Sequence, residues 1–413
     1  MAPSGFFQLI SGLALTSVQT TASLTSRLTS IYTYDDSKLC TGIASLVESE
    51  GYPFERHDVV TQDGYIIEMH RIPRGREPCP EPCHREPVFA MTGLAADSAT
   101  FVFNLPRLSL GFVLADNKYD VWLGNSRGNA YGKRHTKFDP KSRRFWDFTF
   151  HEHAVYDVPA QIDYVLNATK RNNLIYVGYS QGTLVFFTMM SEKPEYNDKV
   201  KAFAGLTPFN KLAHMKVPPL ALFAPHAEPL LQAASFMGHH EVLPRGLRIL
   251  PWARRFCAYL TRGICTFFGD RLINLGSNYV NETRLPLYLC FAPSGTSMKN
   301  IIHLDQMVKS KKPQKFDYGV EMNRVLYGQR RPPLYNLSNV KTDVGAFWSE
   351  GDEFVAPQDV RDLVRDLGPR VKKNNYIDDV QYTHVHFIVG TVNSAYLNKD
   401  LLEFLGRYRA PGP

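Results

Sequence analysis

Short apolar runs that alternate with helical patterns are the clearest periodic feature of this chain. The five runs lie at residues 87–91, 119–123, 174–178, 200–206 and 344–348. Each is too short for an average helix, which is typical of a strand buried on both faces. Strands that alternate with helices indicate βαβ crossovers. The pattern therefore predicts an α/β fold with a mostly parallel sheet and helices on both of its faces.

One hairpin and one helix have more specific signals. Residues 57–72 form two β-rich runs around Asp63-Gly64, which predicts an antiparallel hairpin with a tight turn. Thr149 and Glu152 have capping-box spacing, and the following apolar residues recur at helical intervals. His151 and His153 lie beside Glu152 without the His-Glu-x-x-His spacing of a zinc site, so we interpret them as surface residues at the helix start.

The alternation fails between residues 209 and 327. This segment is apolar and proline-rich, and a structureless connection of that length is improbable inside a compact domain. We therefore expect an inserted helical cap, or lid, at 209–327. The remaining ranges, 40–208 and 328–410, would together form a single catalytic core.

The N-terminal residues 1–22 contain an apolar run that is too short to span a bilayer and ends in small polar residues. We interpret them as a signal peptide and expect no transmembrane anchor. Three N-glycosylation acceptors, at Asn167, Asn281 and Asn336, fit a secretory route. These features predict a secreted or lysosomal protein.

Composition and charge argue against a nucleic-acid partner. The 413 residues are 44% hydrophobic and 21% charged, as in a globular protein. The net charge of +7 is spread along the chain, and the basic runs at 141–144 and 309–312 lack interleaved aromatic residues. We therefore expect no nucleic-acid partner.

Six cysteines are too few for a disulfide scaffold in a chain of this length. Cys257 and Cys265 are the best local pair for a disulfide. Cys79 and Cys83 have three residues between them and no second ligand pair follows, so their spacing fits neither a haem attachment motif nor a zinc site. We interpret that segment as a proline-rich surface loop.

Gly178-Tyr179-Ser180-Gln181-Gly182 follows one of the predicted strands and precedes a predicted helix. Small residues on either side of a serine permit a strained strand-to-helix turn, called a nucleophile elbow, which projects the hydroxyl above the sheet edge. This context predicts that Ser180 is a nucleophile.

A serine nucleophile needs an imidazole base and a carboxylate that orients the imidazole. Asp352 follows the predicted strand at 344–348, at the carboxyl edge of the sheet where ligands bind. We favour it over Asp343, at the other end of that strand, and over Asp359, in the first turn of the next helix. His384 and His386 are both candidate bases, and the sequence pattern alone does not choose between them.

Taken together, these residues resemble the acid lipase family, which includes gastric, lingual and lysosomal acid lipases. The resemblance runs from about Gly51 to the C-terminus. It rests on the motifs at 51–53, 61–65, 114–128, 178–182 and 293–297, and on the segments around Trp348 and His384. The block at 116–128 is far more specific than the serine pentapeptide. The resemblance implies an α/β-hydrolase fold with a cap, acting on neutral lipid esters such as triacylglycerols or sterol esters.

The resemblance also implies roles for individual residues. The family's nucleophile, acid and base correspond to Ser180, Asp352 and His384, and its oxyanion-hole donors to the backbone amides of Leu94 and Gln181. The paired cysteines of the family's cap correspond to Cys257 and Cys265. The chain departs from the family at Thr92 and Tyr179, where histidines are usual, and at His386, where an acid is usual. The segment around Asp352 is also one residue shorter than usual.

The sequence therefore predicts a serine ester hydrolase of the lipase type that needs neither a metal nor an organic cofactor. Its substrate would be met at a lipid–water interface, where the apolar face of an opened cap becomes favourable. One alternative is a capped esterase for small soluble esters. Another is a lipid-binding protein of the same fold that has lost turnover.

Overall fold

The computed structural model describes residues 40–77, 84–216, 238–246 and 277–409. The predicted signal peptide, the pair Cys79 and Cys83, and the pair Cys257 and Cys265 lie outside the described residues. So does most of the central part of the predicted cap. Those predictions stay predictions.

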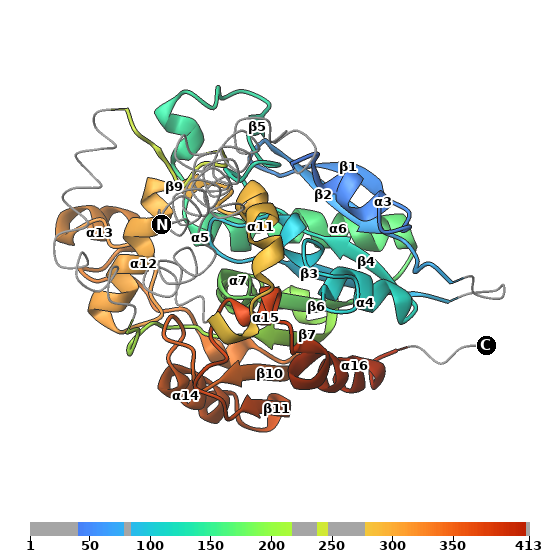
Figure 1. Ribbon diagram of the computed structural model, residues 1–413. Helices are drawn as coiled ribbons and strands as arrows, with labels where there is room; N and C mark the ends of the chain where they lie inside the picture. The colour runs from blue at the N-terminus through green and yellow to red at the C-terminus, as the bar shows by residue number, and fades with distance from the viewer. Residues whose placement is uncertain (1–39, 78–83, 217–237, 247–276, 410–413) are drawn as a thin grey trace, which may run out of the picture.

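A single large sheet forms the centre of the described fold (Figure 1). Its main path runs β1-β2-β4-β3-β6-β7-β10-β11. The strands are β1 (Glu55–Val60), β2 (Tyr65–Ile72), β3 (Glu86–Met91), β4 (Tyr119–Leu123), β6 (Leu174–Tyr179), β7 (Val200–Leu206), β10 (Asp343–Ser349) and β11 (Val371–Ile377), with β5 (Arg134–His135) pairing to β2. From β4 to β11 every pairing is parallel. The predicted α/β class and all five predicted strands are thus confirmed.

The predicted hairpin is confirmed as β1 and β2, which pair antiparallel from Glu55 opposite Arg71 to Val60 opposite Ile66. Gly64 in its turn has φ +101°, a conformation that side chains other than glycine's rarely adopt. This hairpin forms the antiparallel edge of an otherwise parallel sheet.

Helices cover both faces of the sheet (Figure 1), because each buried strand points alternate side chains into two separate cores. In β4, for example, Val121 and Leu123 enter one core and Trp122 the other. The first core is closed by α3 (Ile43–Glu48), α4 (Leu110–Asp116), α11 (Leu285–Phe291), α15 (His386–Val389) and α16 (Lys399–Gly406). The second is closed by α5 (Phe150–Glu152), α6 (Val158–Thr169), α7 (Gln181–Glu192) and α14 (Pro357–Leu367).

The helix predicted after Thr149 begins with the expected capping box, but its histidines are not at the surface. The Thr149 side chain accepts from the amide of His151, and Glu152 accepts from the amide of Thr149. After a π-helical turn at 153–157 the segment continues as α6. His153 is buried and His151 half-buried, because the helix start is covered by α12 (Met298–Ser310), whose Asn300 accepts from the amide of Phe150. The surface interpretation of these two histidines is therefore wrong.

The described parts of 209–327 contain three α-helices, two short 3-10 helices and one short strand pair. The α-helices are α11, α12 and α13 (Val320–Tyr327), and β8 (Glu241–Val242) pairs with β9 (Thr296–Ser297). A disulfide that we did not predict joins Cys40, which precedes α3, to Cys290 in α11. The helical character agrees with the sequence, whereas the division into core and cap stays a prediction.

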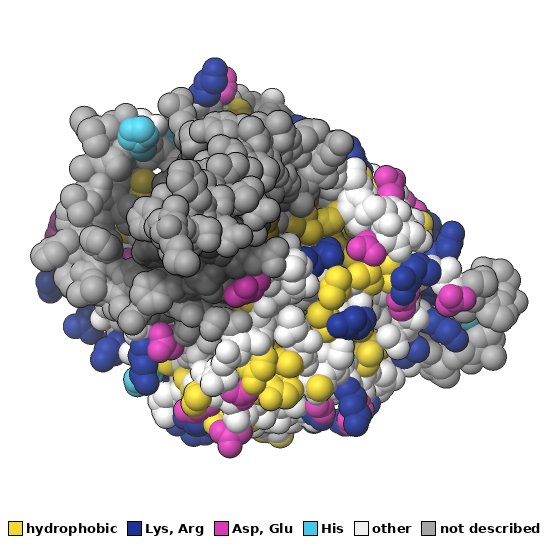
Figure 2. Space-filling view, viewed as in Figure 1, with side chains coloured by type: hydrophobic (Ala, Val, Ile, Leu, Met, Phe, Trp, Pro, Cys, Tyr) yellow, Lys and Arg dark blue, Asp and Glu magenta, His cyan; other side chains and the backbone are white. Residues whose placement is uncertain are grey.

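Two surface properties bear on partners. No helix within the described ranges is both long enough and apolar enough to cross a bilayer. Among the described residues on the face drawn in Figure 2, lysine and arginine side chains are interspersed with aspartate and glutamate and do not gather into a basic stripe.

Candidate active site

Ser180 lies in the sharp turn between β6 and α7. Its backbone has φ +52° and ψ −121°, which is a strained conformation for a residue with a side chain. The Ser180 amide donates to the carbonyl oxygen of Leu206 in the neighbouring strand β7, at 3.0 Å. The predicted strand–turn–helix context of a nucleophile elbow is therefore present.

The glycine at position 182 lets α7 approach the sheet closely enough to form this turn. A Cβ atom built on Gly182 would lie 2.3 Å from the carbonyl oxygen of Met91 in β3. No such contact is tolerated between real atoms, and the obstacle is backbone that cannot rotate away. The motif's second glycine is therefore required by packing.

His384 joins Ser180 and Asp352 through its two ring nitrogens. Its Nε2 lies 2.8 Å from Ser180 Oγ, and its Nδ1 lies 2.8 Å from Asp352 Oδ2. Both His384 and Asp352 are buried. The other Asp352 oxygen accepts from the amides of Phe354 and Val355, at 2.9 and 2.8 Å. The structure thus brings the three side chains that the sequence singled out into one hydrogen-bonded chain.

The alternative base lies elsewhere. His386 Nδ1 accepts from the amide of Thr383 at 2.8 Å, and its ring lies 5.6 Å from that of Tyr279 and 5.5 Å from that of Tyr382. His386 thus packs into an aromatic cluster, and His384 is the histidine that meets the serine.

The two alternative acids have other partners. Asp343 opens strand β10, at the far end from the serine, and accepts from the Tyr408 hydroxyl at 2.9 Å. Asp359 lies in the first turn of α14, as predicted, and accepts from the backbone amide and the Nδ1 of His214, at 3.0 and 2.9 Å.

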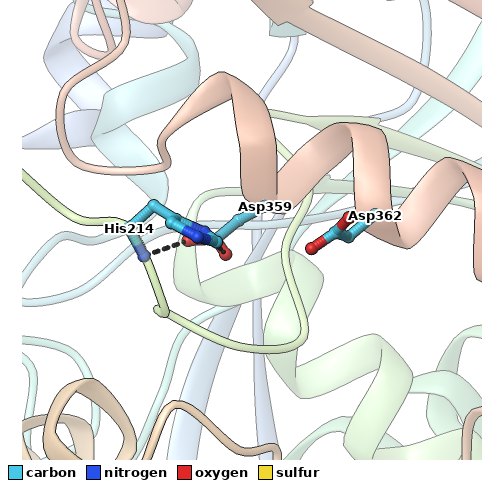
Figure 3. A group of neighbouring side chains, drawn as sticks. All are labelled: His214, Asp359 and Asp362. Carbon is cyan, nitrogen blue, oxygen red and sulfur yellow. Dashed lines mark hydrogen bonds and ion pairs between the residues drawn. The ribbon is translucent and has the colours of Figure 1, made fainter.

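Asp359 also belongs to a group that could offer three ligand atoms to a metal (Figure 3). The ligand atoms of His214, Asp359 and Asp362 all lie within 4.8 Å of one another. However, Asp362 already pairs with Lys211 at 3.0 Å and with Arg365 at 2.8 Å. We interpret the group as an ion-pair network that joins the segment after β7 to α14.

The segments that carry the Leu94 and Gln181 amides lie on either side of Ser180. A Cβ atom built on Gly93 would lie 3.0 Å from the Ser180 Cβ, so the loop after β3 runs directly against the serine. Gln181 is the first residue of α7, where the helix dipole favours negative charge. The positions of these segments are compatible with an anion that forms on a group attached to Ser180 Oγ.

Tyr179, one of the departures from the family pattern, packs behind the base. Its hydroxyl donates to the carbonyl oxygen of His384 at 3.3 Å, and the two rings are 5.3 Å apart. Burial first, and then the nearby Asp352 carboxylate, raise the pKa of Tyr179 well above its usual value. The tyrosine therefore stays neutral and supports the backbone of His384.

A group of buried polar residues next to this site was not predicted from the sequence. Asp97, Ser294 and Asn300 are all buried, and they contact the loop after β3 or the side chain of Gln181. Ser294 belongs to the motif at 293–297, which was noted only as part of a resemblance. For Asp97 and Asn300 the local sequence held no signal, because their partners come from distant segments.

Comparisons with known proteins agree with the fold described above. Residues 43–105 match a family described as a partial alpha/beta-hydrolase lipase region, and residues 91–234 match the alpha/beta hydrolase fold. A crystal structure from Sulfolobus solfataricus, 14% identical, superposes with a TM-score of 0.52 over 86% of this chain and 99% of that chain. This structural likeness shows the fold alone.

The similarity to curated proteins is much stronger. Lipase lipl-1 of Caenorhabditis elegans is 38% identical, over 82% of this chain and 85% of its own. Human Lipase member K is 35% identical, over 89% of this chain and 91% of its own. Human gastric triacylglycerol lipase is 36% identical, over 84% of this chain and 86% of its own. The chain therefore belongs to the acid lipase family of α/β-hydrolases, and it is a carboxylic ester hydrolase of the lipase type.

Proposed function

We propose that this lipase hydrolyses neutral lipid esters, such as triacylglycerols or sterol esters, through an acyl-enzyme formed on Ser180. The observation that carries the proposal is the position of His384, hydrogen-bonded to Ser180 Oγ on one side and to Asp352 on the other. The names of the relatives, among them a gastric triacylglycerol lipase, support the class of substrate.

In the acylation step, Ser180 Oγ attacks the ester carbonyl carbon and its proton passes to Nε2 of His384. Asp352 holds the imidazole in the tautomer with the proton on Nδ1 and stabilises its positive form. The tetrahedral intermediate then collapses. The bond to the alcohol oxygen breaks, and His384 gives its proton to that oxygen, so the alcohol leaves neutral.

Deacylation repeats these steps with water as the nucleophile. His384 removes a proton from water, and the resulting hydroxide attacks the acyl carbon. The Ser180 Oγ–carbon bond then breaks and the serine regains its proton from His384. The fatty acid is released, and the enzyme returns to its starting state.

The backbone amides of Leu94 and Gln181 would hold the oxyanion in both steps. Amides fixed beside the developing charge stabilise it without reorganising, and losing one such donor typically costs on the order of 3 kcal/mol. The close approach of the loop at Gly93 to Ser180 supports this assignment.

We further infer that 209–327 acts as a cap over the site and that the protein enters the secretory pathway. The exposed side chains of Asn167 and Asn336 are accessible for glycosylation, which supports that route. We expect glycosidase treatment to increase the gel mobility of the protein isolated from secreting cells. The change in mobility should be smaller for Asn336→Gln.

The deciding experiment is a panel of emulsified glycerides and sterol esters, assayed across pH with the wild type and with Ser180→Ala. We expect turnover of at least one substrate by the wild type and loss of nearly all of it in the variant. Comparable turnover by both proteins would rule out Ser180 as the nucleophile. A rate that does not rise as substrate passes from monomer to emulsion would favour an esterase for soluble esters.

A further inference from the structure

Both segments that carry the proposed oxyanion donors are held by side chains from the part of the chain predicted to be an insertion. The loop after β3, which carries Leu94, is held through Asp97. The start of α7, which carries the Gln181 amide, is held through the side chain of Gln181. The contacting residues, Arg245, Ser294 and Asn300, all lie between positions 209 and 327.

Asp97 is the anchor of the Leu94 loop. It is 1% exposed, and one of its oxygens accepts from the amide of Ala99 at 2.9 Å, within its own loop. Its other oxygen accepts from the Arg245 guanidinium and from the Ser294 hydroxyl. The Ser294 amide also donates to the carbonyl oxygen of Ala95 at 2.6 Å, one residue beyond Leu94.

The Arg245 guanidinium that pairs with the Asp97 carboxylate also packs against two aromatic rings. Its guanidinium carbon lies 4.7 Å from the Tyr131 ring centre and 5.4 Å from that of Phe291. Burial opposes the charge, but Asp97 and Tyr131 outweigh burial and raise the pKa of Arg245. Removing one partner of a buried ion pair leaves an uncompensated charge, so the geometry at Asp97 depends on Arg245 being docked.

Asn300 holds the second donor segment. Its side chain is fully buried at the start of α12, and its Nδ2 donates to Gln181 Oε1 at 2.9 Å. Its Oδ1 accepts from the amide of Phe150 at 2.7 Å, which fixes the orientation of the amide group. Gln181 Nε2 in turn lies 3.4 Å from Nδ1 of His153. Both polar atoms of the Gln181 side chain, which lies next to the nucleophile, therefore have a partner.

We propose that Arg245 and Asn300 are positioning residues for the oxyanion hole, acting through Asp97 on the amide of Leu94 and through the side chain of Gln181 on its own amide. The inference rests on the proposed function, because it matters only if these amides bind an oxyanion. The physical reason is preorganisation: such donors are effective only when they are already fixed where the charge develops. Neither residue touches the reacting atoms.

The test compares Arg245→Met with Lys133→Met on a short, soluble p-nitrophenyl ester. Lys133 is the matched control, because it docks the same 238–246 segment through Glu241, at 2.6 Å, without contacting the oxyanion loop. We expect Arg245→Met to lower kcat roughly 10- to 100-fold with KM within about threefold, since one donor is worth 10²–10³ in kcat. Lys133→Met should leave both constants within about threefold, and Arg245→Lys should recover part of the loss.

Asn300→Asp tests the second donor. It keeps the acceptor for the Phe150 amide and removes the donor to Gln181, so kcat should again fall with little change in KM. In both variants the affinity of an alkylboronic acid, which forms a tetrahedral adduct on the serine, should weaken by the same factor as kcat/KM. Rates are normalised to the fraction of protein that a fluorophosphonate labels, so poorly folded molecules do not count.

The outcomes separate this inference from the function on which it rests. A Ser180-dependent wild type whose Arg245 and Asn300 variants behave like Lys133→Met overturns the positioning roles alone. A loss confined to KM or to thermal stability overturns them as well. Failure of the wild type to hydrolyse any ester overturns the proposed function instead. Should Arg245→Met not fold, Arg245→Lys and Asn300→Asp carry the same comparison.

Discussion

At the scale of single residues, the orientation of His384 depends on one carboxylate. Asn in place of Asp352 can still accept from the amides of Phe354 and Val355, so the turn should keep its shape. Asn can, however, donate to Nδ1 and so stabilise the wrong imidazole tautomer. We expect Asp352→Asn to lower kcat by about 10⁴-fold, the size of effect known for a serine triad. Asp359→Asn, which alters only the contact with His214, should keep kcat within a few-fold in the same ester assay.

A second residue-scale prediction concerns stability at low pH. His303 is fully buried against Phe150, with a ring separation of 4.1 Å, and its Nε2 donates to the carbonyl oxygen of Gln314. Burial lowers the pKa of His303 to about 3. Because this value lies below the unfolded value of about 6.5, the unfolded chain binds the extra proton first as pH falls, and stability declines between those two values.

His303→Gln should therefore flatten the decline of the unfolding free energy between about pH 6 and 4. The difference in slope should approach 1.4 kcal/mol per pH unit, the contribution of one proton. Urea titrations at several pH values would measure it. His84→Gln removes an exposed imidazole and serves as the control. Equal slopes for the wild type and His303→Gln would contradict the prediction.

At the scale of secondary-structure elements, the approach of α7 to β3 is set by Gly182. A methyl group at that position would meet the Met91 carbonyl at 2.3 Å, so Gly182→Ala should displace the helix start that carries the Gln181 amide. We expect a loss of about 1–3 kcal/mol in unfolding free energy, as for overpacking, and a large fall in kcat. Gly406→Ala is the control, since nothing lies near its added methyl. A wild-type melting temperature for Gly182→Ala would refute this account.

Elements whose signals are local were predictable from the sequence. Strands β3, β4, β6, β7 and β10 each contain a continuous apolar run. The elbow at Ser180 follows from its flanking glycines, and the capping box at Thr149 is a spacing within four residues. The burial of His153 was not predictable, because it depends on α12, which reaches the helix start from about 150 positions away in the chain. A polar residue beside a helix start looks the same whether or not another element covers it.

At the scale of the whole molecule, contacts between residues far apart in the chain could not be predicted from local sequence patterns. No local pattern distinguishes His384 from His386; the family resemblance pointed to His384, and the folded chain shows that it is the one hydrogen-bonded to Ser180. In the same way, the pairing of Arg245 with Asp97 spans 148 positions, and no periodicity in either segment indicates it. The chemistry of the site was therefore predictable from short motifs, whereas the contacts that hold it in place were not.

The longest covalent constraint in the described structure is the disulfide between Cys40 and Cys290, 250 positions apart. It ties the chain before α3 to α11, which packs in the first core. Closing so long a loop restricts the unfolded chain strongly, by roughly 5 kcal/mol in the entropic model. The double variant Cys40→Ala/Cys290→Ala should therefore unfold at a clearly lower urea concentration, while kcat on a soluble ester at 25 °C stays near that of the wild type.

The control is Cys40→Ser/Cys290→Val, in which valine fills the space left by the buried sulfur. It should lose a similar amount of unfolding free energy, because the cross-link and not the cavity carries the effect. If the valine variant instead regains the wild-type midpoint, packing around Cys290 is what stabilises this region and the cross-link contributes little.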